Sequence, residues 1–267
     1  MRSIKTIATP RAAGVLLALG LLLGCSSPEG AGSAAPTPEA ASPEGNAAAP
    51  TALASATPEA SAATAIVSQF PPDGLAGSVI IDSVNAEGTV RARTSAGPGE
   101  GELLMISSST EERGHLNVSS NYGLEGEQTY QADYSIVYRK GQQDQVLLKL
   151  PAFLFVQPAD RVLEFTVIHF EQAEVFLLAP QYKSGHGLVA YAFAMDKKSG
   201  LVFPVSFKQG EIVHDTLVYS ELPPFPANED EQLVVYAPVG AGGDPEPGPQ
   251  RYELDLDKRQ FVAGQSE

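Results

Sequence analysis

The chain has 267 residues, of which 32 are acidic and 17 are lysine or arginine, so its formal net charge at pH 7 is −15. An acidic surface repels phosphate backbones, and no basic patch interleaved with aromatic residues occurs in the sequence, so nucleic acid is excluded as a partner. Net charge otherwise bears on solubility and not on the fold.

Residues 1–24 are predicted to be an export signal. Arg2, Lys5 and Arg11 form a positive start without any acidic residue, and an apolar run follows over residues 12–23. This run has the length of a secretory signal core and is short for a membrane-spanning helix. The sequence therefore predicts that the mature protein lies outside the cytoplasm.

The signal ends in Leu22-Leu23-Gly24-Cys25, which resembles the lipobox of bacterial lipoproteins. The resemblance implies that the Cys25 thiol receives a diacylglycerol and that the chain is cut just before Cys25. Two acyl chains hold a protein stably at a membrane, since each buried CH₂ contributes about 0.8 kcal/mol. The alternative is an ordinary signal peptide or membrane anchor with a chance cysteine. The implied location is the bacterial cell envelope, and Ser26 leaves open whether the inner or the outer membrane holds the anchor.

Cys25 is the only cysteine of the chain. A lipidated Cys25 leaves no thiol for disulfides, for thiolate catalysis or for cysteine-ligated metals. The four histidines, His115, His169, His186 and His214, show no close ligand spacing. We therefore expect no metal and no cofactor.

Residues 25–65 are predicted to be a lipidated cysteine followed by a disordered tether. Beyond Cys25 the segment is almost entirely Ala, Ser, Thr, Pro, Gly and Glu, without any aromatic residue, lysine or arginine. Such a composition cannot bury enough apolar surface to offset the loss of conformational entropy. A flexible coil of this length spans roughly 35 Å on average, so the tether would lift the next domain off the membrane.

Residues 66–267 are predicted to form a single β-rich domain, because their hydrophobic pattern has a period of two. From Tyr130 to Tyr138 the even positions are mostly aromatic or aliphatic and the odd positions mostly polar. The segment from Leu188 to Met195 is apolar on both faces, which is typical of a central strand. Further strands are expected at 79–82, 89–93, 102–106, 115–119, 146–150, 162–170, 174–179, 201–207, 212–219, 233–237, 252–256 and 260–262.

No stretch of ten or more residues in this domain has a convincing helical stripe. The predicted fold class is therefore mainly β, an antiparallel meander of two packed, sandwich-like sheets. A propeller-like or barrel-like β architecture is the alternative.

The best candidate for ligand binding is the loop between two strongly apolar strands at residues 181–187. It combines an aromatic ring, a cation, a hydroxyl and an imidazole, in Tyr182, Lys183, Ser184 and His186, with two glycines. Binding residues favour loops of this kind on a rigid scaffold, although a solvated turn uses the same residue types. No catalytic residue is predicted, since no G-x-S-x-G motif surrounds Ser184.

The leading functional hypothesis is a lipid-anchored, non-enzymatic β-domain that binds or scaffolds a partner in the cell envelope. The partner would be an envelope protein, a glycan or a small ligand, in addition to the membrane itself. The alternative is an envelope hydrolase that acts on a glycan or another polymer, with carboxylates from distant strands brought together by the fold.

Overall fold

The computed structural model describes residues 65–71, 74–97, 99, 101–238 and 248–264. The predicted signal, Cys25 and the tether up to residue 64 lie outside these residues. All described residues belong to one unit, residues 60–267. Within them, no helix has both the length and the apolar character needed to cross a membrane.

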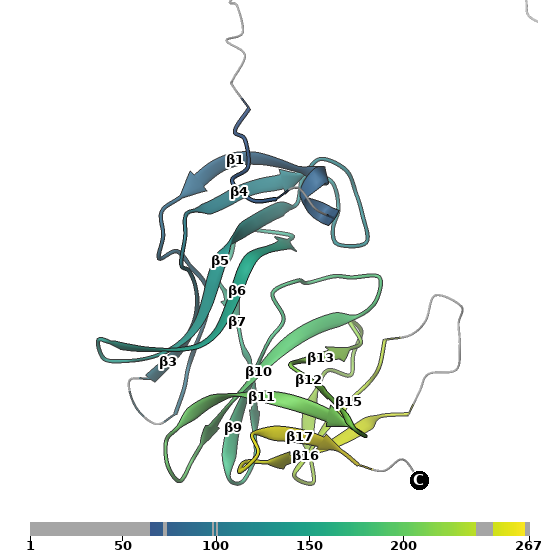
Figure 1. Ribbon diagram of the computed structural model, residues 1–267. Helices are drawn as coiled ribbons and strands as arrows, with labels where there is room; N and C mark the ends of the chain where they lie inside the picture. The colour runs from purple at the N-terminus through teal and green to yellow at the C-terminus, as the bar shows by residue number, and fades with distance from the viewer. Residues whose placement is uncertain (1–64, 72–73, 98, 100, 239–247, 265–267) are drawn as a thin grey trace, which may run out of the picture. The chain divides into compact units, whose positions relative to one another are not determined.

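The first of two sheets is a half-barrel of seven strands, preceded by the short 3-10 helix η1, Gly74–Ser78 (Figure 1). Its centre is β5, because β4 and β3 share one edge of β5 and β6 pairs along the other edge. All pairs are antiparallel except β2 with β7. The strands are β1 Val79–Asn85, β2 Val90–Ser95, β3 Gly101–Ser107, β4 Glu111–Leu116, β5 Gln128–Lys140, β6 Gln143–Gln157 and β7 Leu163–Glu164.

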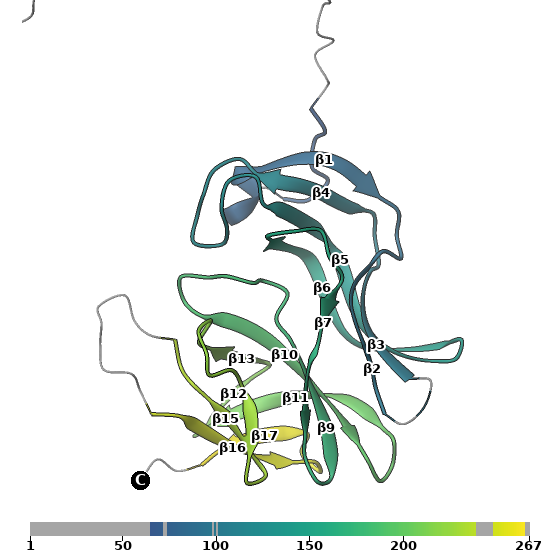
Figure 2. The same ribbon diagram turned by 180° about the vertical axis from the view of Figure 1, so that it is seen from behind.

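The second sheet has ten strands and curls into a nearly closed barrel, seen from behind in Figure 2. Its central strand is β10, which pairs with β9, β11 and β13. A parallel pair, β11 with β17, brings the end of the chain against the middle of the sheet. The strands are β8 Thr166–His169, β9 Ala173–Leu178, β10 Leu188–Asp196, β11 Val202–Gln209, β12 Ile212–His214, β13 Thr216–Tyr219, β14 Ala227–Glu229, β15 Gln232–Val235, β16 Gln250–Asp255 and β17 Gln260–Ala263.

The apolar core consists of two clusters, and β10 contributes to both. Phe193 and Met195 belong to the cluster shared by the two sheets, together with Tyr130 and Phe155 from the first sheet. The small side chains at 190, 192 and 194 belong to the cluster inside the barrel, where Phe207 and Phe261 stack with ring centroids 5.5 Å apart. The two apolar faces of residues 188–195 therefore have a physical cause, since each face meets a different cluster.

The prediction of a mainly β fold with two packed sheets is confirmed. Four expected strands differ most in their bounds. The strand expected at 146–150 is part of the longer β6, and the strand expected at 162–170 is interrupted at Phe165 and forms β7 and β8, which belong to different sheets. The strand expected at 115–119 is β4, and it begins earlier, at Glu111. The strand expected at 212–219 is interrupted at Asp215 and forms β12 and β13.

We predict that Gly114→Ala weakens the first sheet, because β1, which pairs with β4 at Gly114, leaves no room for a side chain there. A Cβ atom at this position would lie 2.0 Å from the carbonyl oxygen of Ile80, so the backbone of β1 would have to move. The expected loss of unfolding free energy is about 1–3 kcal/mol, measured by urea denaturation. Gly77→Ala is the matched control, since a Cβ atom there has no neighbour within 4 Å. Equal midpoints for the two variants would contradict the prediction.

Candidate functional site

A seven-residue strap, residues 65–71, contacts the first sheet on the face opposite the shared core. Its anchor is the buried side chain of Glu112 on β4. The Ser68 hydroxyl donates a 2.7 Å hydrogen bond to this carboxylate, and the backbone N–H of Gln69 donates a second of 2.6 Å. Successive residues of a strand point to opposite faces, so Glu112 meets the strap while Glu111 points to the other side of the sheet.

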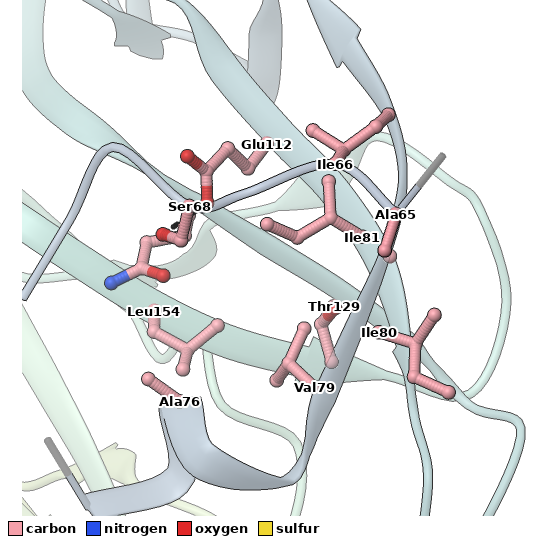
Figure 3. A pocket seen from close by; sticks show the side chains of 12 residues that line it. Ala65, Ile66, Ser68, Ala76, Val79, Ile80, Ile81, Glu112, Thr129 and Leu154 are labelled. Atoms are coloured by element: carbon pink, nitrogen blue, oxygen red, sulfur yellow. Dashed lines mark hydrogen bonds between the residues drawn. The ribbon is translucent and has the colours of Figure 1, made fainter. Parts of the chain in front are cut away.

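A cavity of about 280 Å³ lies between the strap, η1, β1 and the strands β4 to β6; we call it the strap pocket (Figure 3). Most of its wall is aliphatic. Figure 3 shows Val79, Ile81 and Leu154 around it, with Glu112 and Ser68 towards one end. The complete lining is Ala65, Ile66, Ser68, Ala76, Val79, Ile80, Ile81, Glu112, Gly114, Thr129, Gln131 and Leu154.

One polar group of the strap pocket has no partner in the described part of the chain. The hydroxyl of Thr129 on β5 is buried and makes no hydrogen bond there. Leaving a buried hydroxyl unpaired costs about 1–3 kcal/mol of folding free energy. A ligand that hydrogen-bonds to the Thr129 hydroxyl would recover that cost and bind more tightly. The pocket thus offers aliphatic walls and, at Thr129, a buried hydroxyl without a partner among the described residues.

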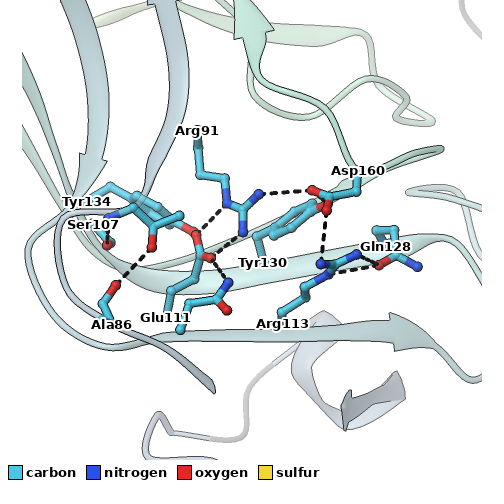
Figure 4. Close-up of polar contacts among 11 residues, drawn as sticks. Ala86, Arg91, Ser107, Glu111, Arg113, Gln128, Tyr130, Tyr134 and Asp160 are labelled. Carbon is cyan, nitrogen blue, oxygen red and sulfur yellow. Dashed lines mark hydrogen bonds and ion pairs between the residues drawn. The ribbon is translucent and has the colours of Figure 1, made fainter. Parts of the chain in front are cut away.

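The opposite face of β4 and β5 holds a buried ion pair between Arg91 and Glu111 (Figure 4). Nε and Nη2 of Arg91 both donate to the Glu111 carboxylate, the former at 2.7 Å. The hydroxyl of Tyr134 donates to the same carboxylate at 2.6 Å, and the side-chain amide of Asn85 at 2.9 Å. Each oxygen of the Glu111 carboxylate therefore accepts two hydrogen bonds, which uses all four of its lone-pair sites.

Asp160 extends the network towards solvent. Its carboxylate pairs with Arg91 at 3.1 Å and with Arg113 at 2.9 Å, and the Tyr130 hydroxyl donates to it at 2.9 Å. The guanidinium carbon of Arg91 also lies 4.0 Å from the centre of the Tyr130 ring. Figure 4 shows how Arg91 stands between the two carboxylates.

Burial by itself would raise the pKa of Glu111, but the hydrogen bonds from Arg91, Tyr134 and Asn85 outweigh it and lower the pKa. Burial likewise disfavours the charged form of Arg91, and the Glu111 carboxylate more than offsets this and raises the Arg91 pKa. Burial, with the nearby Asp160 carboxylate, raises the pKa of Tyr130 to about 12.

Glu111 is thus ionised, fully paired and 0 % exposed, which suits a structural ion pair and not a proton donor in catalysis. Among the described residues, no group of three or more His, Cys, Asp or Glu side chains is arranged to hold a metal ion. Glu111 and Glu112 are neighbours on β4 and face opposite ways, so these two carboxylates do not form a pair.

The loop predicted from the sequence lies between β9 and β10 and is held by two acidic side chains. The Tyr182 hydroxyl donates to the Glu127 carboxylate, and the Ser184 N–H donates to Glu221 at 3.1 Å. Burial and the Glu127 carboxylate raise the pKa of Tyr182 to about 12. The Ser184 hydroxyl accepts a 3.1 Å hydrogen bond from the N–H of His186, which closes a local turn.

The structure therefore does not gather the four candidate side chains into one cluster. Tyr182 lines a cleft beside β6 and β13, while Lys183, Ser184 and His186 are not among the residues of that cleft. Ligand binding by these four residues stays a prediction. Thr129, Glu112 and the strap were not predicted as site residues, since a threonine and a glutamate in a strand carry no motif.

We predict that Glu111→Gln destabilises the protein by about 3–5 kcal/mol at pH 7, because it leaves the buried Arg91 charge without its anionic partner. The matched control is Asp144→Asn, which breaks the exposed pair of Arg139 and Asp144. Exposed pairs contribute about 0–1 kcal/mol. Urea denaturation of both variants measures the difference, and equal losses would contradict the buried-pair argument.

The same pair predicts how stability depends on pH. The Glu111 pKa is lower in the folded chain than its ordinary value of 4.5, so its contribution is complete above that value. The contribution is lost as the pH falls through the folded pKa. The wild-type unfolding free energy should therefore drop on acidification below about pH 4.5, and that of Glu111→Gln should drop less. Parallel pH curves would refute this assignment.

The chain matches no protein-family model, no curated protein and no solved structure. The functional argument is therefore built on the pockets and contacts described above.

Proposed function

We propose that this chain is a lipid-anchored, extracytoplasmic binding protein of the bacterial cell envelope, and that its strap pocket holds a small, mostly aliphatic ligand. The lipobox-like Leu22-Leu23-Gly24-Cys25 supports the anchor, and the Pro- and Ala-rich residues that follow support a spacer. The β-domain then acts at a distance from the membrane surface. Binding, and not catalysis, is proposed for it.

The observation that carries the binding proposal is the unpaired Thr129 hydroxyl in the wall of an aliphatic pocket. Binding sites for small molecules are concave, mostly apolar and equipped with a few placed polar groups that fix orientation. The Glu112 carboxylate is already occupied by Ser68 and Gln69, so it holds the strap and is not free for a ligand. A ligand with one hydroxyl or carbonyl on an aliphatic body matches this arrangement.

The binding test uses 1-octanol, which has an aliphatic body and one hydroxyl. Its addition should shift the backbone amide NMR signals of residues lining the strap pocket. Ala76→Phe should abolish the shifts, because a ring at the half-buried position 76 fills the cavity. Thr129→Val should weaken octanol binding by about fivefold while keeping the shape of the wall.

Ala86→Phe is the matched control, since Ala86 is exposed and does not line the pocket. It should bind octanol like the wild type. If octanol shifted no signal of the pocket, or if Ala76→Phe bound it unchanged, the proposed ligand site would be wrong.

The anchor is tested separately with Cys25→Ala in the full-length chain. The wild type should incorporate labelled fatty acid and fractionate with membranes. Cys25→Ala should incorporate no label and remain uncleaved at this site, because the acceptor thiol is gone. A variant that matured and fractionated like the wild type would show that Cys25 is not the anchor.

A further inference from the structure

A second cavity of about 510 Å³, which we call the junction cleft, lies between the end of β6, the segment of β7 and β8, and the strands β9, β10 and β13. Leu163, Leu177 and Leu188 contribute apolar surface to it. The cleft shares no lining residue with the strap pocket. Its volume falls within the roughly 300–1,000 Å³ of small-molecule sites.

The first unpartnered group of the junction cleft is the side-chain amide oxygen of Gln157. The residue is only 2 % exposed, and its Oε1 has no hydrogen-bond partner in the described ranges. Its Nε2 donates to the carbonyl oxygen of Pro180, which fixes the orientation of the amide. A residue that lines the cleft thus carries a buried acceptor that receives no hydrogen bond from the described chain.

The second group is the hydroxyl of Tyr219 on β13. Tyr219 is 9 % exposed and lines the same cleft. Its hydroxyl forms no hydrogen bond within the part of the chain that the structure describes. Burial raises the pKa of Tyr219, so the hydroxyl stays protonated and can both donate and accept.

Arg161 and Glu164 add one positive and one negative charge to the lining of the cleft. The two side chains form no ion pair with each other, and Arg161 pairs with no acidic residue among those described. The charges of the lining cancel, which favours a neutral ligand over a carboxylate or a phosphate. Both side chains offer further hydrogen bonds, since a guanidinium only donates and a carboxylate only accepts.

We propose that the junction cleft binds a sugar unit. Hydroxyl groups can donate to Gln157 Oε1 and exchange a hydrogen bond with Tyr219, and the C–H surface of a sugar ring can lie against the leucines. A purely aliphatic ligand would leave the Gln157 oxygen unpaired, which is the costly outcome for a buried acceptor. Tyr182, from the loop singled out in the sequence, borders the same cleft. This proposal does not depend on the ligand of the strap pocket.

The test titrates the full domain with glucose and with N-acetylglucosamine and follows backbone amide NMR signals. At least one of the two sugars should bind with a dissociation constant of about 1 mM or tighter and shift signals around Gln157 and Tyr219. Tyr219→Phe should weaken binding by about fivefold, because it removes only the hydroxyl. Arg161→Ala, at an exposed position, should also weaken binding without affecting the fold.

Tyr191→Phe is the matched control, because Tyr191 lies on the neighbouring strand β10 and does not line the junction cleft. It should bind sugar like the wild type. Octanol binding at the strap pocket should be unchanged in Tyr219→Phe, so failure of one site is distinguishable from failure of the other. The proposal is overturned if neither sugar binds, or if Tyr219→Phe and Arg161→Ala both bind as tightly as the wild type.

Discussion

The alternation of side chains along β4 and β5 is the constraint on which the rest of the structure depends. Each residue of a strand points away from its neighbour, and both faces of these two strands are covered. One face joins the aromatic core and encloses Arg91 and Glu111. The other face meets the strap and borders the strap pocket. A shift of register by one residue would exchange the two faces, so the ion pair and the pocket depend on the same pairing.

The buried ion pair of Arg91 and Glu111 requires further hydrogen-bonding residues from other parts of the sequence. Taking Arg91 and Glu111 out of water is costly, and hydrogen bonds from Tyr134 and Asn85 are needed to complete the carboxylate. The groups come from four separate segments of the chain, so they meet only when the half-barrel has closed. An ion pair of this kind tolerates few alternative packings, which favours one register of β2, β4 and β5 over the others.

The hydrophobic pattern was sufficient to predict the β class, because β5 and β10 carry clear period-two signals. It failed for the start of β4, where Glu111, Glu112 and Arg113 have the composition of a solvated turn and are instead paired by distant residues. The unpartnered groups of the two cavities were not predictable for a similar reason. Thr129 and Gln157 are ordinary strand residues, and only their surroundings leave them without partners. The contacts of Tyr182 and Ser184 with Glu127 and Glu221 join segments far apart in sequence, which no local pattern encodes.

The strap also determines how mechanical load enters the domain. Tension applied to the chain at Ala65 reaches Ser68 and Gln69 before it reaches β1. These two residues are held by the Glu112 carboxylate and by hydrogen bonds between Gln69 and Thr110. The β1–β4 ladder behind them pairs six residues of β1 with six of β4. The first element to detach under a pull from the N-terminal side is therefore the strap. Its release would remove one wall of the strap pocket while both sheets remain folded. The strap can detach in this way because, among the described residues, its hydrogen bonds to the rest of the domain go to only two partners, Thr110 and Glu112.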